Sequence, residues 1–241
     1  MNATVARLTA RSLLGRRRAL FLLALPGVLL LVAGLVRALA GRDPEIAVGL
    51  LGGLAMTTLV PLVGLIAGTG SIGPEIDDGS IVYLLSKPLN RHSIVTTKFM
   101  TAITVITAFA AVPTVLAGLI LSGPSRLVAA FGVGALIAGI AYGALFLLLA
   151  VVTRNAVVVG MLYALIWEGL VGGFIPGAQN LSIVQWALAI TEQMLGGQAE
   201  TLGVSSGVGL GAAIPLLVVL VVGCTWYAGW RLRSLRLTSD E

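Results

Sequence analysis

Charged side chains are scarce in this chain. Of its 241 residues only 10% are Asp, Glu, Lys or Arg, whereas 58% are hydrophobic and the mean hydropathy is +1.04. A soluble domain carries about 25% charged residues, which keep its surface hydrated. The shortage of charge therefore excludes an ordinary soluble fold and predicts a membrane protein.

Residue types that build catalytic and metal sites are also nearly missing. The single cysteine, Cys224, excludes a disulfide framework and a multi-cysteine metal site. The single histidine, His92, lies in a polar stretch, and no nucleophile and base pair with it. The only lysines, Lys87 and Lys98, stand in Ser-Lys-Pro and Thr-Lys-Phe, so the Gly-Lys-Ser/Thr of a P-loop is absent. We expect no catalytic, cofactor-binding or metal-binding residues in this chain.

One motif matches a nucleotide site by its letters alone. Gly68 to Gly73 reads Gly-Thr-Gly-Ser-Ile-Gly, which fits the dinucleotide fingerprint. That fingerprint functions between a short strand and a helix, whereas here a long apolar run precedes it and Pro74 follows it. We interpret the match as accidental.

Long uncharged runs fill most of the chain and predict an all-α, polytopic fold with one transmembrane domain over residues 1–241. A bilayer core about 30 Å thick needs about 20 helical residues. The six expected spans are residues 19–39, 46–72, 94–121, 127–152, 156–175 and 208–230. The first is interpreted as a retained span, because its apolar stretch is too long for a signal peptide and Arg37 occupies the would-be cleavage region.

The distribution of Lys and Arg predicts the orientation. With six spans and a cytoplasmic N-terminus, twelve of the 15 basic residues fall on the cytoplasmic side, and the other side keeps only Arg37, Arg42 and Arg126. We therefore expect both termini in the cytoplasm and the protein in the cytoplasmic (inner) membrane. Basic residues spread over several short loops do not indicate nucleic-acid binding.

Two segments outside the spans have helical patterns. Arg7, Arg11 and Arg18 fall on one side of a helix over residues 1–18, which predicts an interfacial helix facing anionic lipid; a frayed basic tail is the alternative. Residues 176–207 contain no Lys or Arg and predict a short amphipathic helix that caps the outer face. A poorly ordered loop is the alternative there.

The connection between the second and third spans is the most informative segment. Pro74 suits a first helical turn, acidic residues at 75, 77 and 78 favour the positive end of the helix dipole, and Lys87 favours the other end before Pro88 stops the helix. Ile76 and Tyr83 share one side, and Leu84 and Leu85 lie on another. The pattern predicts a separate cytoplasmic helix over residues 74–87 that contacts two bodies at once.

This segment resembles the signature of permease subunits of the ABC-2 type of ATP-binding-cassette transporters. The matching residues are Glu75, Gly79, Ser80, Leu84, Leu85, Ser86, Pro88, Arg91, Ile94 and Lys98. The resemblance implies a coupling helix that docks in a groove of a separate ATP-binding subunit. The implied coupling residues are Glu75, Ile76, Asp77, Asp78, Gly79, Tyr83, Leu84, Leu85, Lys87, Pro88 and Arg91.

The resemblance further implies the assembly. Two permeases, identical or related, work with two ATPase subunits, which bind ATP and Mg, and most members of the family export. The resemblance becomes vague after residue 100 and names no substrate. The residues alone leave two rivals open, a secondary transporter driven by an ion gradient and a membrane anchor or assembly scaffold; a membrane enzyme lacks a nucleophile and base.

Glu168 is an acidic residue within the expected fifth span. A carboxylate at mid-membrane costs about 2.5–3.5 kcal/mol, so it must face protein or water, or carry a proton. It either lines the translocation route or has a structural role. Arg154, in a short inner turn, either fixes the topology or makes a second contact with the ATPase. Glycine pairs four apart, such as Gly64 and Gly68, predict close helix packing.

Overall fold

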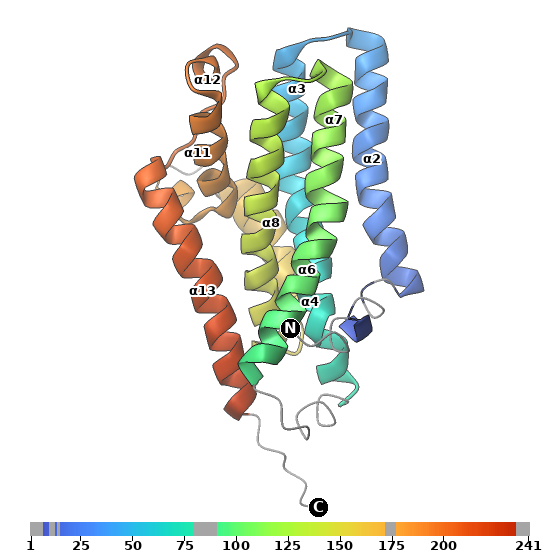
Figure 1. Ribbon diagram of the computed structural model, residues 1–241, viewed down its shortest axis with the longest axis vertical. Helices are drawn as coiled ribbons and strands as arrows, with labels where there is room; N and C mark the ends of the chain where they lie inside the picture. Colours follow the sequence, from blue (N-terminus) through green and yellow to red (C-terminus); the bar gives the residue numbers. More distant parts are fainter. Residues whose placement is uncertain (1–6, 10–12, 14, 80–90, 172–176, 235–241) are drawn as a thin grey trace, which may run out of the picture.

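The protein is a bundle of long, nearly parallel helices. The structure, a computed structural model, describes residues 7–9, 13, 15–79, 91–171 and 177–234. These residues contain helices and connections and no strand. In Figure 1, α2 forms one edge of the bundle, α13 the other, and α8 lies in the middle.

Five helical stretches are long and apolar enough to cross a membrane. Each spans one of the predicted segments with boundaries moved by a few residues. They are α2 (Arg16–Ala40), the stretch α3–η1–α4 (Pro44–Leu50, Leu51–Leu59, Val60–Asp77), the stretch α6–η2–α7 (Arg91–Ile106, Thr107–Ala111, Val112–Ser122), α8 (Arg126–Val152) and α13 (Leu210–Ser234). The multi-pass helical fold is confirmed, whereas the count of six spans stays a prediction.

Two of these stretches widen into a π-helix just before a proline. The π-helix η1 is followed by Pro61, and η2 is followed by Pro113. A proline has no N–H and its ring crowds the carbonyl of the preceding turn, and a wider turn accommodates both effects. The helices therefore continue through the prolines and remain long enough to cross.

The described residues of the expected fifth span form a shorter helical stretch. Residues 156–171 form α9 (Ala156–Leu162) and the π-helix η3 (Tyr163–Val171), and the apolar part is too short to count as a crossing helix. The chain then continues through η4 (Ala178–Leu181), α11 (Ile183–Leu195) and α12 (Gln198–Thr201). In Figure 1, the gold ribbon of 156–171 lies behind α8, and α11 stands in the upper half, below α12. This limb of the bundle is thus made of two helical pieces.

The predicted amphipathic helix in residues 176–207 corresponds to α11. It packs against α8 and α13 and buries Val184, Trp186, Ala187 and Leu195. It stands beside the upper half of α8 instead of lying across the end of the bundle as a cap. Burial against two helices explains this orientation, because α11 is apolar over more than one face.

The centre of the bundle is the contact between α4 and α8, where glycines allow a close approach. A Cβ atom built on Gly68 would lie 2.9 Å from the carbonyl oxygen of Gly143 and 2.9 Å from Cβ of Phe146. One on Gly64 would meet Tyr142. These glycines therefore pack within the chain. The stretch 68–73 lies inside α4, which confirms that its fingerprint-like pattern is no nucleotide loop.

The expected N-terminal helix is described only in part. Residues 7–9 are helical, with Arg7 exposed, whereas Arg11 and the Arg18 side chain lie outside the described residues. Leu13 is fully buried and Leu8 is exposed. α2 begins directly after Gly15.

Candidate functional site

The end of the bundle at which α4 ends and α6 begins carries a cluster of buried polar groups. This end, the lower one in Figure 1, also holds the start of α2, the turn between α8 and α9, and the end of α13. We call it the lower end and the opposite one the upper end. The residues that define the cluster come from the N-terminal helix, α4 and α6.

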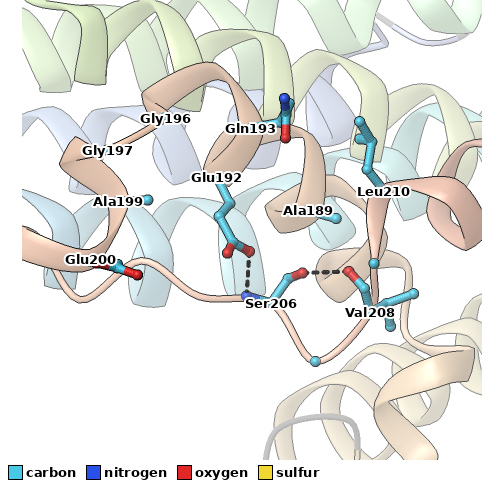
Figure 2. Close-up of a pocket in the computed structure, with 12 residues that line it drawn as sticks. Ala189, Glu192, Gln193, Gly196, Gly197, Ala199, Glu200, Ser206, Val208 and Leu210 are labelled. Carbon is cyan, nitrogen blue, oxygen red and sulfur yellow. Dashed lines mark hydrogen bonds between the residues drawn. The ribbon is translucent and has the colours of Figure 1, made fainter.

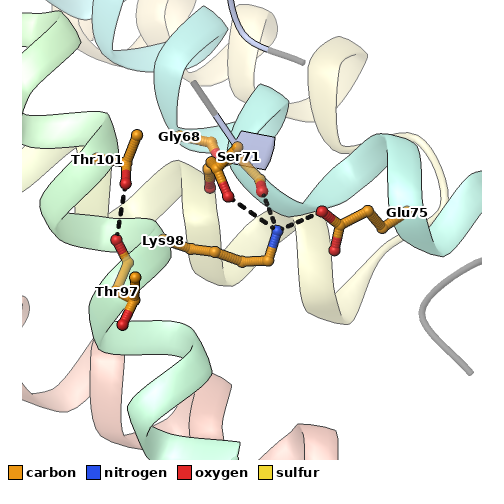
Figure 3. Close-up of polar contacts among 7 residues, drawn as sticks. Gly68, Ser71, Glu75, Thr97, Lys98 and Thr101 are labelled. Atoms are coloured by element: carbon orange, nitrogen blue, oxygen red, sulfur yellow. Dashed lines mark hydrogen bonds and ion pairs between the residues drawn. The ribbon is translucent and has the colours of Figure 1, made fainter. Parts of the chain in front are cut away.

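Lys98 lies at the centre of this cluster (Figure 3). Its side chain is fully buried, and its Nζ donates to Glu75 Oε1 at 2.6 Å and to the carbonyl oxygen of Ser71 at 2.7 Å. A third, longer contact of 3.5 Å reaches Thr9 Oγ1. A buried ammonium ion is costly unless it is paired and its N–H groups are all accepted. Three acceptors from two other segments meet this requirement.

The Ser71 residue contributes to this cluster through its backbone. Its carbonyl accepts from Lys98, while its hydroxyl donates to Gly68 O at 2.8 Å. Pro74 lies three residues later inside α4, and the helical donor that it lacks is the one to the carbonyl four residues before it, at Gly70.

The position of Pro74 corrects the expected start of the separate helix over 74–87. α4 continues without a break through Pro74 to Asp77, and Gly79, with a φ of 70°, follows its end. Glu75 and Asp77 therefore lie in the last turn of α4 and not in a first turn. Acidic residues favour the N-terminal end of a helix, and Glu75 and Asp77 lie at the C-terminal end of α4 instead. The ion pair between Glu75 and Lys98 offsets this unfavourable position.

A second buried carboxylate, Glu168 in η3, lies further up the bundle. Its Oε1 accepts from Tyr163 Oη at 3.1 Å and from the Ile183 backbone N–H at 2.9 Å, and its Oε2 accepts from the Ser182 hydroxyl at 2.5 Å. Ser182 and Ile183 begin α11, so the carboxylate lies at the positive end of that helix. Glu168 thereby joins the two helical pieces of the fifth limb.

Tryptophans support the same joint. Trp167 Nε1 donates to Leu181 O at 3.2 Å, and Trp186 Nε1 donates to Asn180 O at 2.9 Å. Every one of these partners of Glu168 and the tryptophans belongs to η3, η4 or α11. The contacts favour the structural alternative for Glu168 over a place in the translocation route.

The upper end contains an open cavity of about 490 Å³ between α11, α12 and the start of α13 (Figure 2). Glu192 and Glu200 line it together with several glycines, and Glu192 Oε2 accepts from the Ser206 backbone N–H at 2.9 Å. Within the described part of the chain, no three His, Cys, Asp or Glu side chains lie close enough to hold a metal ion.

The comparison with protein families decides the identity of the chain. Residues 4–222 match the family described as ABC-2 family transporter protein. The chain belongs to this ABC-2 transporter family. It is a multi-pass membrane protein of the permease type, and the resemblance inferred from residues 75–98 is confirmed. A comparison with curated proteins gives no match.

The structure places the implied coupling residues of this ABC-2 permease in two groups. Glu75 and Ile76 are half-buried at the end of α4, Asp78 and Gly79 are exposed beyond it, and Arg91 is the first residue of α6. Asp77 closes α4. The others, Tyr83, Leu84, Leu85, Lys87 and Pro88, lie outside the described residues.

Three residues of the lower cluster were not predicted as site residues. Lys98 was noted for topology and for the family signature, Ser71 only as part of the accidental fingerprint at 68–73, and Thr9 not at all. The available signal for Lys98 was a lone lysine among Ile, Val, Thr and Phe, a pattern that indicates a buried, paired cation. Nothing in the sequence indicates that Ser71 offers a backbone carbonyl.

Proposed function

We propose that this ABC-2 permease is the membrane subunit of an ATP-driven exporter and is moved by a separate ATP-binding subunit that docks on residues 75–91. Two copies of the permease, or one copy and a related one, would assemble with two ATPases that bind ATP and Mg. The observation that carries the proposal is the position of the signature residues. The described ones lie at one end of the bundle, at the end of α4 and the start of α6.

The lower end is then the cytoplasmic side. The start of α2, the end of α13, the turn containing Arg154 and the ends of α4 and α6 all lie there. This arrangement matches the distribution expected from the positive charges, with Arg37, Arg42 and Arg126 at the opposite end. It supports cytoplasmic termini and an inner-membrane location.

The mechanism follows from how the docking segment is attached. Residues 78–90 begin at the end of α4 and finish at the start of α6, and α4 is packed on α8 through glycines without intervening side chains. A push on this segment would therefore move α4, α6 and α8 as packed bodies, because close-packed helices shift as rigid units. This chain would supply the pathway and its partner the hydrolysis.

A charge placed in the docking segment tests the proposal. The permease is co-expressed with its ATPase and reconstituted in lipid, and co-purification and permease-stimulated ATP hydrolysis are measured for Leu84→Asp. We expect both to fall at least about tenfold, because an unpaired charge in a docking groove is costly. The matched control is Leu39→Asp, at an 80% exposed position in the last turn of α2 at the upper end, which should change neither.

The outcome decides between the candidates. Unchanged co-purification and hydrolysis in Leu84→Asp would overturn the docking assignment. Transport driven by an ion gradient without any ATPase would replace the proposal with a secondary transporter. Nucleotide-independent behaviour of the whole complex would favour a scaffold.

A further inference from the structure

Lys98 joins three segments that are far apart in the sequence. It is 23 residues from Glu75, 27 from Ser71 and 89 from Thr9. One ammonium group therefore contacts the end of α4 and the N-terminal helix while its own backbone belongs to α6.

The position of this contact relative to the docking segment is specific. Glu75 lies one turn before Asp78, where α4 ends, and Lys98 lies about two turns after Arg91, where α6 begins. The ion pair therefore fixes the distance between α4 and α6 near the two helix ends that residues 78–90 connect. Thr9 adds the N-terminal helix to the same base.

A charged group is suited to fixing this base in one arrangement. An apolar side chain of similar size packs in several orientations, whereas an ammonium ion deprived of its acceptors is left buried and unpaired, at a large cost. Each of the three acceptors must consequently stay within reach of Nζ whenever the segments move. The segments can then move together but not apart.

We propose that Lys98 is a positioning residue for energy coupling, which holds α4, α6 and the N-terminal helix as one rigid base under the docking segment. This inference rests on the proposed function. A push by the ATPase on residues 78–90 is then transmitted to three elements at once. Without Lys98 the ATPase would still dock, but its motion would be lost in relative movement of the base.

This role differs from a purely structural one in what it predicts. A structural lysine affects stability and, through it, every activity of the complex to the same extent. A positioning lysine affects stimulated hydrolysis while docking is retained, and it makes the base deform when nucleotide binds. The distance between the N-terminal helix and the start of α6 reports that deformation directly.

The experiment uses the full permease with its ATPase in lipid nanodiscs. Cys224 is replaced by Ser, and spin labels are attached through Leu8→Cys in the N-terminal helix and Ser93→Cys near the start of α6, two exposed positions outside the docking segment. The label distance is measured by pulsed electron resonance with and without ATP, alongside co-purification and ATP hydrolysis. The variants are Lys98→Met and Lys98→Arg.

In the labelled permease that keeps Lys98, we expect the same label distance with and without ATP. In Lys98→Met the distance distribution should broaden and become dependent on ATP, and stimulated hydrolysis should fall at least about fivefold while co-purification is unchanged. Lys98→Arg, which keeps a buried cation with several donors, should restore a narrow distribution. Thr96→Val, which removes an exposed hydroxyl from the same helix, is the matched control and should resemble the protein with the original Lys98.

Thr9→Val serves where Lys98→Met does not fold, because it removes only the hydroxyl and preserves the shape of the side chain. It should broaden the distance distribution without affecting the contact to Glu75. A Lys98→Met distribution as narrow as that of the unsubstituted protein, or a Thr9→Val one if Lys98→Met does not fold, overturns the inference. Absence of any co-purification with the unsubstituted permease overturns the proposed function instead, and the label distances in the permease alone still test the base.

Discussion

Two carboxylates, the half-buried Glu75 at the lower end and the buried Glu168 higher in the bundle, are stabilised in different ways. Glu75 pairs with the cation of Lys98, which comes from another long helix. Glu168 accepts only from neutral groups, a tyrosine and a serine hydroxyl and the first N–H of α11. The Glu75 contact connects two membrane-spanning helices, α4 and α6. The Glu168 contact connects η3 with α11, the two helical pieces of the fifth limb.

The difference reflects two structural requirements, one at the lower end of the bundle and one in the fifth limb. At the lower end, the helix ends must keep a fixed spacing around the docking segment, and an ion pair between buried groups resists separation most strongly. In the fifth limb, η3 ends and α11 begins within the bundle, and the N–H groups at the start of α11 need acceptors. The Glu168 carboxylate accepts from this helix start, which also provides the buried carboxylate with donors. The lower region therefore depends on charge and the higher one on hydrogen-bond acceptance.

Loss of the lysine alone should have the largest effect. Lys98→Ala leaves the Glu75 carboxylate beside the cluster without its cation and should lower the free energy of unfolding by about 3–5 kcal/mol. The measurement is equilibrium unfolding of the purified permease in mixed micelles. The double variant Glu75→Ala/Lys98→Ala leaves neither charge and should recover most of that loss; a double variant as unstable as the single one would show that the pair is unimportant.

The protein should tolerate loss of the negative charge of Glu168, but it should be destabilised by loss of the Glu168 oxygens that accept hydrogen bonds. Glu168→Ala leaves the Tyr163 and Ser182 hydroxyls and the Ile183 N–H without an acceptor, and should lower the free energy of unfolding by about 3 kcal/mol. Glu168→Gln keeps one amide oxygen and should cost about 1 kcal/mol. Equal losses in the two variants, measured by the same unfolding assay, would mean that charge matters here as much as at Glu75.

Packing one to two turns above the ion pair should have an intermediate effect. Gly68→Ala places a methyl group 2.9 Å from the Gly143 carbonyl oxygen, and should cost about 2 kcal/mol by pushing α4 from α8. The matched change Gly73→Ala, in the same helix, meets nothing within 4 Å and should be neutral or slightly stabilising. Similar melting temperatures for the two variants would contradict the close approach of α4 and α8.

The smallest expected effect concerns the start of α11. Ser182 caps this helix by accepting from the Gln185 N–H at 3.3 Å and also donates to Glu168. Ser182→Ala should therefore cost about 1–2 kcal/mol. Thr201→Ala, which removes an exposed hydroxyl bond at the end of α12, should stay within about 0.5 kcal/mol of the original protein.

The sequence was sufficient to predict most of the helical layout. Uncharged runs locate five long helices to within a few residues, because exclusion of charge from lipid is the strongest constraint on such a chain. The fifth limb was harder, because its apolar run was predicted as one span over 156–175, whereas the described residues 156–171 form the short helix α9 and the π-helix η3. An apolar run does not show in the sequence where an α-helix widens into a π-helix.

The candidate site was predicted only in outline. The family signature located it, but the local rules for helix starts placed a new helix at Pro74, where α4 in fact continues. A proline and acids in sequence favour a first turn, and only the tertiary pairing of Glu75 with Lys98 shows why they occur in a last turn. The partners of Glu168 likewise follow a turn whose path no periodicity predicts.

Cross-linking from the end of α4 tests the central claim most directly. In the Cys224→Ser background, Asp78→Cys carries a short bifunctional cross-linker, and the assembled transporter is examined for a product that joins permease and ATP-binding subunit. We predict a strong product from Asp78→Cys and none from Thr201→Cys, an exposed position at the upper end. A product from Thr201→Cys, or none from Asp78→Cys in a complex that still hydrolyses ATP, would contradict the account.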